Sequence, residues 1–555
     1  MKRRNFLKIL PAAGVTSFAV NGYAMRPFAN SKMARVLNSC DGVEDRVLVL
    51  IQLKGGNDGV NTVIPVNQYD TYANLRPSIA IPQNNLIDLD NTLGINEQVG
   101  LHPSMQKIKE LYDDGKAAIV QGVGYQDMNQ SHFKGTDLWM SGGDGTPANN
   151  NISTGWMGRS LQAFYPDVVG VPTSTNPDPL GIQIGDPNPN LGFHTDTEHQ
   201  NLINMSGQDP SGFFSLIQTI GGAPIMNVPD SDHGEELAFI MGVEQSTNLY
   251  AQRISDVFNA GTNSLDPYPT TVTSRSSLGQ QLKTIARLIS GGCKTKIYLC
   301  QLTGFDTHSS QVDGGSPTVG DHADLLTELA EAVKNFNVDL DGLGLADHVL
   351  TCTFSEFGRC AKGNASDGTD HGTLAPMMLF GKNVQAGVSG TNVNLSNLTN
   401  DNQLQGMQFD YRQVFTTILQ DWLGASEDVL TDVMFSGYQK MPLVDTAFVV
   451  SPDCYLPMSV GIFDNYVTKK PLTVFPNPAN AISEVAFEHS GGSFDARLSI
   501  HSLGGSIMST MYTKVNQGND SFLIDLSILP PGTYFVRLEN KATGKAEVAK
   551  LQVVR

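Results

Sequence analysis

Residues 349–372 read VLTCTFSEFGRCAKGNASDGTDHG, and they indicate the fold of the longer part of the chain. The run begins as an apolar strand over 349–354 and then breaks into a loop. That loop carries two acids, an arginine and a histidine: Glu356, Arg359, Asp370 and His371. Open α/β sheets present binding sites in this way, in the loops after the carboxyl ends of their strands. We therefore expect an α/β domain with a site at this point.

Two earlier stretches repeat the pattern of a buried strand followed by a glycine-rich polar turn. Residues 297–302 (IYLCQL) open into GFDTH at 304–308, and residues 47–53 (VLVLIQL) open into KGGNDG at 54–59. Three strand ends that each offer an oxygen or nitrogen ligand predict one shared metal-centred site. The candidate metal ligands are Asp58, Asp306, His308, Glu356, Asp370 and His371.

Carboxylates and imidazoles suit zinc, manganese or calcium, so the expected cofactor is a divalent ion of one of these kinds. Such an ion would activate water or polarise the phosphoryl or sulfuryl oxygen of an ester substrate. Arg359 would then bind the anionic oxygens of that ester bidentately. Two of these residues also have a structural alternative. Asp58 suits a turn, and His308 suits a loop histidine whose hydrogen bonds are made within the protein. His102, which precedes Pro103, suits a helix start, and His132 suits either a structural or a ligand role. His322 and His348 are expected to be structural.

Apolar spacing predicts strands that alternate with helices along the first part of the chain. The strands are expected at 47–53, 117–123, 296–302, 348–354 and 376–380, and the helices at 103–114, 235–259, 276–290, 323–340 and 414–423. This alternation favours an α/β fold with a mostly parallel sheet flanked by helices. Residues from about 170 to 230 are dense in Pro, Gly, Asn and Asp, which is typical of a functional lid or insertion.

After about residue 446 the helical periodicity disappears, and seven short strands follow at a spacing typical of a small β-sandwich. The expected strands are 472–475, 482–487, 496–500, 506–512, 521–526, 533–538 and 547–554. We expect a linker at 25–45, the α/β domain at 46–445, a second linker at 446–470 and the sandwich at 471–555.

Composition points to an exported protein. The net charge of -19 argues against nucleic acid or an anionic membrane as a partner. Residues 1–24 match a twin-arginine signal peptide, with RRNFLK from Arg3 and the small-x-small site Gly22-Tyr23-Ala24, although a general secretory signal is the alternative. The apolar stretch of this signal is too short for a stable anchor, so no transmembrane anchor is expected in the mature protein. Six cysteines allow up to three disulfides, and Cys300 and Cys352 suit buried thiols equally well.

The C-terminal block resembles the sorting domain of cargo of the type IX (Por) secretion system. The motifs that carry this resemblance are VFPNPA at 474–479, LPPGTY at 529–534 and the final strand KLQVV at 550–554. The resemblance implies the type IX secretion machinery as a partner, together with the twin-arginine export machinery upstream. The implied location is the cell surface or the medium, reached through the periplasm. A carbohydrate-binding or spacer sandwich is the alternative.

Residues 46–445 look like a large family of twin-arginine-exported bacterial proteins labelled a domain of unknown function, fifteen-oh-one, related to sulfatases and alkaline phosphatases. The motifs are LKGGNDGVNTVIP at 53–65, LHP at 101–103, SHF at 131–133, TGWMGR at 154–159, GFDTH at 304–308, SEFGR at 355–359 and GTDHG at 368–372. The resemblance implies an alkaline-phosphatase-like fold with Asp58 as an early ligand and Ser131 as the nucleophile. It also implies ligand pairs at Asp306 with His308 and at Asp370 with His371, while Phe357 stands where a histidine ligand is expected.

Two classes of function follow. The first is a metal-dependent hydrolase of phosphate or sulfate esters at the cell surface, with Ser131 and Arg359 as catalytic residues and an anionic small molecule or glycan ester as substrate. The second is a catalytically degenerate surface protein that keeps a sulfatase-like fold for binding or structure. The absence of a histidine at position 357 favours the second class.

Overall fold

The computed structural model describes two compact units, residues 40–456 and residues 472–554. The gaps within the first are 41, 167, 169–171, 173–175, 187–190, 196–201, 206–249 and 273–276; those within the second are 490–492, 503–506, 516–517, 528 and 542–545. Short strands are also described at Phe18–Val20 and Tyr23–Met25. The twin-arginine pair and most of the expected insertion therefore lie outside the described residues.

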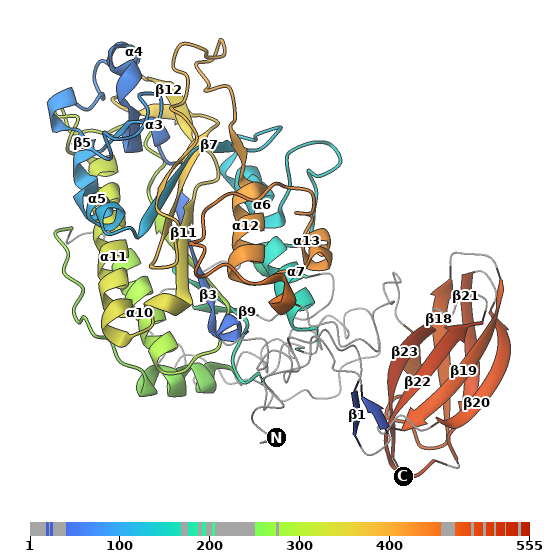
Figure 1. The fold of residues 1–555 in the computed structure, drawn as a ribbon. Coiled ribbons are helices and arrows are strands. Elements are labelled where there is room, and N and C mark those ends of the chain that lie inside the picture. The colour runs from blue at the N-terminus through green and yellow to red at the C-terminus, as the bar shows by residue number, and fades with distance from the viewer. Residues whose placement is uncertain are drawn as a thin grey trace, which may run out of the picture. The chain divides into compact units, whose positions relative to one another are not determined.

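A nine-stranded, mostly parallel sheet forms the centre of the first unit (Figure 1). The strand order is β15 (Gly387–Ser389), β7 (Ala117–Gly124), β14 (Ala375–Phe380), β11 (Val349–Phe354), β3 (Val47–Lys54), β10 (Ile297–Thr303), β8 (Gly181–Ile184) and β9 (Leu202–Met205), with β16 (Phe409–Asp410) paired to β7. Strand β14 runs antiparallel to its neighbours β11 and β7, and the other pairs are parallel. The central strands are buried on both faces, which is why they read as continuous apolar runs.

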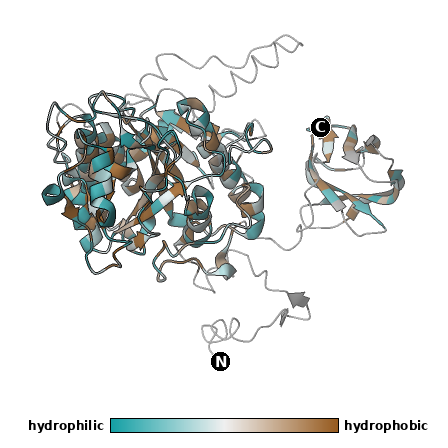
Figure 2. Ribbon diagram, turned by 90° about the horizontal axis from the view of Figure 1, so that it is seen from above, coloured by the Kyte–Doolittle hydropathy of each residue, from teal (hydrophilic) through white to brown (hydrophobic). Residues whose placement is uncertain are grey.

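Helices cover both faces of this sheet, so the sheet has two cores. Side chains alternate along β3, and Val49 and Ile51 therefore enter one core while Leu48 and Leu50 enter the other. The first core packs against α5 (Gln106–Asp113), α10 (Ser277–Ser290) and α11 (Asp321–Leu343). The second packs against α6 (His132–Ser141), α7 (Trp156–Phe164), α12 (Tyr411–Thr417) with its π-helical continuation Ile418–Trp422, and α13 (Glu427–Asp432). Figure 2 shows apolar residues along the sheet and polar residues on the outer sides of the helices.

Small elements surround one end of the sheet. They are α3 (Gly59–Thr62), α4 (Tyr69–Leu75), the three-stranded sheet β4 (Val63–Pro65), β6 (Val99–Leu101) and β5 (Ile87–Asp88), and the hairpin β12 (Arg359–Gly363) with β13 (Thr369–His371). This is the end at which β3, β10 and β11 finish, as the labels of α3 and β12 show in Figure 1.

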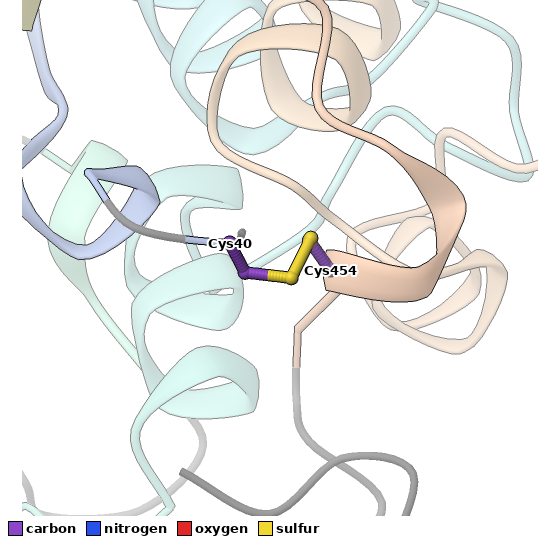
Figure 3. The surroundings of a disulfide bond; sticks show 2 residues. All are labelled: Cys40 and Cys454. Atoms are coloured by element: carbon purple, nitrogen blue, oxygen red, sulfur yellow. A yellow bond between two sulfur atoms is a disulfide. The ribbon is translucent and has the colours of Figure 1, made fainter. Parts of the chain in front are cut away.

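A disulfide joins the two ends of the first unit. Cys40 and Cys454 are bonded across a sequence separation of 414 residues (Figure 3). Cys293, Cys300, Cys352 and Cys360 are buried free thiols. The strand cysteines Cys300 and Cys352 are thus thiols, one of the two alternatives that the sequence allowed.

The second unit is a pair of antiparallel sheets with its own apolar core. One sheet is β17 (Thr473–Phe475), β18 (Ile482–His489) and β21 (Gly518–Asp525); the other is β20 (Ile507–Val515), β19 (Phe494–Ser502), β22 (Gly532–Asn540) and β23 (Ala546–Val553). The fold class predicted from the sequence is confirmed: a mostly parallel α/β sheet flanked by helices, followed by a small β-sandwich. Within the part of the chain that the structure describes, none of the helices is long and apolar enough to cross a membrane.

Candidate metal centre

The three predicted loops meet at the carboxyl ends of three neighbouring strands. Strand β3 lies between β11 and β10 and is parallel to both, so the loops after residues 54, 303 and 354 leave the same edge of the sheet. The crevice at this edge is where open α/β sheets bind ligands. The three loops therefore meet at one edge of the sheet, as the sequence pattern predicts.

Glycine at positions 55 and 56 allows the first loop to approach the other two. Both glycines have positive φ, 123° and 83°. A Cβ on Gly55 would lie 2.3 Å from the backbone nitrogen of Asp306, and one on Gly56 would lie 2.5 Å from the ring of Phe357. Only glycine combines this backbone conformation with so close an approach.

Three side chains converge at this edge: His132, Asp306 and His371. His132 begins α6, Asp306 follows β10 and His371 ends β13. One ligand atom from each residue lies within 4.8 Å of the others. The Nε2 atom of His132 is 3.4 Å from Asp306 Oδ2, and the Nε2 atom of His371 is 3.4 Å from Asp306 Oδ1.

Hydrogen bonds at the far side of each ring fix the tautomers of both histidines. His132 Nδ1 lies 2.9 Å from Oε1 of the fully buried Glu356, which also accepts a bond from the backbone N–H of Gly55. His371 Nδ1 lies 2.8 Å from the carbonyl oxygen of Gln130, which can only accept. Each Nδ1 is therefore the donor, and in the neutral ring each Nε2 presents a lone pair toward Asp306. Metal-binding histidines are held by a carboxylate or a carbonyl in this manner.

The two Nε2 atoms are shielded from solvent and have no hydrogen-bond partner among the described residues. Such unpaired buried atoms call for an explanation, and an unseen ion is one of the recognised ones. Each Nε2 atom lies 3.4 Å from Asp306, that of His132 from Oδ2 and that of His371 from Oδ1. Each distance is close to the roughly 3.3–3.4 Å between two ligand atoms on a tetrahedral ion with bonds of about 2.0–2.1 Å. Two imidazoles and a carboxylate are also a donor set that zinc and similar transition ions prefer. The residues at this site therefore fit a metal ion.

The charges around the site favour an ionised ligand carboxylate. Burial opposes ionisation of Asp306, but the hydrogen bond and charge of Arg359 outweigh it and lower the pKa to about 2. The hydrogen bond to Glu356 raises the pKa of His132, while burial and the charge of Arg359 lower the pKa of His371. The lowered pKa favours the neutral form of His371, whose Nε2 lone pair can bind a cation. The raised pKa favours the protonated form of His132, and a cation must displace that proton to bind there.

Two further predicted residues lie beside the cluster. His308 Nδ1 is 2.8 Å from Asp306 Oδ1, and its ring lies 4.6 Å from that of His371. Phe357 is fully buried, and its ring lies 4.9 Å from His132 and 4.7 Å from His371. The phenyl ring is thus an apolar contact for both imidazoles.

Arg359 is enclosed by the protein. Its guanidinium donates to the backbone oxygens of Gly55, Gly56, Phe305 and Thr369 and to Asp306 Oδ1, 2.6 Å away. Its side chain is fully buried, and these hydrogen bonds join the three loops to one another. Its predicted role in binding the oxygens of an ester stays a prediction.

Asp58 also has internal partners. Its Oδ2 atom accepts bonds from Arg76 and Gln311, each at 2.6 Å, and both Asp58 and Arg76 are fully buried. Burial raises its pKa, but the charge and hydrogen bond of Arg76 dominate, and the net shift is downward. Asp58 is not one of the three residues that converge, and its role as a ligand stays a prediction.

Three predicted residues remain: Ser131 and Asp370 are exposed, whereas Glu356 is fully buried. Ser131 is exposed at the start of α6, and its hydroxyl makes no capping bond to that helix. Asp370 is exposed, and its Oδ1 accepts a bond from Asn364 at 3.1 Å. Glu356 is linked to the cluster by its hydrogen bond with His132.

His132 is the residue that sequence reasoning did not commit to. The signal was present in the SHF motif at 131–133, which opens a helix directly after a strand and a polar loop. Sequence alone left both roles open because nothing in it shows that α6 begins beside the loops after β10 and β12.

Fold and site together define a two-unit protein with a polar, metal-compatible centre on an α/β sheet and a C-terminal sandwich. Residues 45–434 match the family described as "Protein of unknown function (DUF1501)", and the chain belongs to this family. Residues 473–553 match the "Secretion system C-terminal sorting domain", so the protein is secreted to the cell surface and handled by the type IX system.

The chain is also similar in shape to solved structures. One is the PsFucS1 sulfatase from Pseudoalteromonas sp., with 10% identity, 87% of this chain and 84% of that chain covered, and a TM-score of 0.32. Another is a protein in the alkaline phosphatase superfamily from Vibrio parahaemolyticus, with 9% identity, 63% of each chain covered and a TM-score of 0.30. Overlaps of this size carry no argument about the present site. None of the curated proteins matches the sequence at a significant level.

Proposed function

We propose that this protein is an exported, metal-dependent hydrolase of phosphate or sulfate esters that acts at the cell surface. The observation that carries the proposal is the pair of unpartnered Nε2 atoms, each 3.4 Å from an oxygen of Asp306. A purely structural histidine pair would use these nitrogens in hydrogen bonds.

His132, Asp306 and His371 would hold the ion, with His308 next to them. The two imidazole donors favour zinc or manganese over calcium, which prefers oxygen ligands. Such an ion supplies Lewis acidity toward an ester oxygen and acidifies bound water. The chain itself contributes orientation: Glu356 and the Gln130 carbonyl hold the imidazoles, and Arg359 holds the carboxylate.

Ser131 is the proposed nucleophile because its hydroxyl is exposed, free of a capping bond and adjacent to His132. A hydroxyl in this place needs a nearby group to lower the cost of its deprotonation. Export through the twin-arginine route, before passage of the outer membrane, belongs to the same proposal, and so does a glycan or small-molecule ester as substrate.

A second candidate is a catalytically degenerate binding protein. It is favoured by the enclosure of Arg359 in backbone contacts and by the apolar ring of Phe357 beside the cluster. With Arg359 engaged internally, the anionic oxygens of an ester would have to be held by other groups.

Metal analysis and a substrate panel separate the two candidates. The full chain, purified without chelators, is expected to carry about one ion per chain and to hydrolyse an aryl phosphate or an aryl sulfate. His132→Ala and His371→Ala should lose the ion. His348→Ala is the matched control, because His348 precedes β11 and so lies at the opposite end of that strand from the site. If no ion is found and zinc and manganese cause no thermal shift, the metal proposal fails. If the ion is present but no ester is cleaved, the binding protein becomes the better candidate.

A further inference from the structure

A buried polar network lies behind the proposed metal site, and Gln311 is its centre. Gln311 is fully buried in the segment between β10 and α11. Its Nε2 atom donates to Asp58 Oδ2 at 2.6 Å, and its Oε1 atom accepts from the hydroxyls of Thr307 at 3.1 Å and Thr369 at 2.8 Å. The amide orientation follows from these partners, because an ionised carboxylate can only accept.

These bonds link the loops that carry the proposed ligands. Thr307 follows Asp306 directly, Thr369 precedes His371 by two residues, and the Thr369 backbone N–H donates to the Thr307 carbonyl at 3.1 Å. The Gln311 amide therefore fixes two loops that contribute ligands from different parts of the chain.

The same amide ties both loops to a rigid anchor. Asp58 is paired with Arg76, which also donates to the carbonyl oxygens of Cys360 and Ala361, each at 2.8 Å, in β12. Asp58 begins α3, where it accepts a weak capping bond from Asn61. A side chain that satisfies a carboxylate and two hydroxyls at once leaves the loops little freedom to shift.

We propose that Gln311 is a positioning residue for the metal site, acting through Thr307 and Thr369 on the spacing of Asp306 and His371. This inference rests on the proposed function, because it assumes that these residues bind an ion. Asp58 then acts as the fixed point of the network. Loss of groups that orient metal ligands typically weakens metal binding about 10–100-fold, and that is the effect expected here.

Metal affinity measured beside the stability of the metal-free protein tests this role. The experiment uses the full chain, titrated with Zn²⁺ by calorimetry and with Co²⁺ by visible absorption, which reports the geometry of the ligands. Gln311→Met keeps the length of the side chain and removes all three bonds. We expect a dissociation constant about 10–100-fold higher and an altered Co²⁺ spectrum.

Gln281→Met is the matched control. Gln281 is also buried, and its amide pairs with the backbone N–H and carbonyl of Gln301, which belongs to strand β10 and not to a ligand loop. This variant should lose comparable stability and keep the metal affinity and the Co²⁺ spectrum of the wild type.

The outcomes separate the two proposals. If the wild type binds neither ion, the proposed function itself fails. If the wild type binds and Gln311→Met binds within twofold of it, only the positioning role is overturned. Should Gln311→Met not fold, Thr369→Val decides the question, because it removes one hydroxyl from the network with little change of shape. Weaker metal binding by Thr369→Val supports the role, and unchanged binding overturns it.

Discussion

The buried ion pair between Asp58 and Arg76 gives a prediction that distinguishes a structural aspartate from a metal ligand. Both side chains have no exposed surface, and their charged atoms are 2.6 Å apart. Replacing one member of such a pair leaves the other charge buried without a partner, at a cost of about 3–5 kcal/mol. Asp58→Asn should therefore lower the free energy of unfolding of the metal-free protein by about this amount. The loss for Arg76→Met should be at least as large, because Arg76 also holds Asn61, Cys360 and Ala361.

Tryptophan emission during urea unfolding is the assay. The chain has three tryptophans, and all lie in the α/β unit: Trp139, Trp156 and Trp422. The emission change thus reports this unit and leaves out the sandwich. The double variant Asp58→Asn with Arg76→Met should lose less than the sum of the two single losses, because neither charge is then left unpaired.

The effect should also depend on pH. The charge and hydrogen bond of Arg76 outweigh burial and lower the pKa of Asp58 in the folded state. A lowered carboxyl pKa stabilises the fold above the unfolded value of about 3.9, and this contribution is lost as the pH falls through the folded value. The difference in the free energy of unfolding between the wild type and Asp58→Asn should therefore be largest at neutral pH and decrease in strong acid.

An exposed ion pair supplies the control. Lys382 and Asp347 are each about half exposed, so Asp347→Asn should change the free energy of unfolding far less than Asp58→Asn does. If Asp58→Asn is equally mild in the metal-free protein, the ion-pair argument is refuted. If that variant instead loses only metal affinity, Asp58 is a ligand, as the sequence predicts.

Four further predictions address other parts of the molecule. Cys40→Ala with Cys454→Ala should lower the free energy of unfolding by about 2–4 kcal/mol in urea titrations, since the bond closes a long loop; no change would contradict this. Burial lowers the pKa of His322 to about 4, so the unfolded chain binds this proton at a higher pH than the folded chain does. The free energy of unfolding should therefore decrease as the pH is lowered from about 6.5 to about 4. In acid titrations of His322→Gln this decrease should be smaller. A chain that ends at Lys470 should keep the tryptophan-monitored unfolding transition, and loss of the transition would show that the sandwich supports the first unit. Replacing Arg3 and Arg4 with lysine should trap precursor in the cytoplasm, and normal export in cell fractionation would exclude the twin-arginine route.

The sheet was predictable because its strands are buried on both faces. Runs such as VLVLIQL at 47–53 and VLTCTF at 349–354 cannot be half-exposed strands, and each is followed by glycine or polar residues that end it. The sequence predicts a helix at 323–340, and helix α11 spans Asp321–Leu343 in the structure. The prediction is shorter because the ends of a helix depend on contacts as well as on periodicity. The helix predicted at 414–423 differs more. It begins earlier, as α12 at Tyr411, and changes into a π-helical turn at Ile418–Trp422 that periodicity does not reveal.

The site was predictable at the level of loops and less so at the level of atoms. Strand ends told us that the loops at 54–59, 304–308 and 355–372 would meet. They did not tell us that Arg359 would turn inward to four carbonyl oxygens or that Gln311 would bridge two loops. These contacts depend on the directions of side chains that are tens to hundreds of residues apart in the sequence. Sequence spacing does not encode those directions.

The disulfide between Cys40 and Cys454 makes the α/β unit a closed covalent ring. A protease that cuts any loop between these residues opens the ring without releasing a fragment, because both pieces remain attached through the sulfur atoms. A pull applied to the chain on both sides of the bond is likewise carried by the bond, so the sheet between the cysteines bears none of the load. For a protein that is secreted to the cell surface, the bond therefore keeps the two ends of the α/β unit together after a single cut in the chain between them.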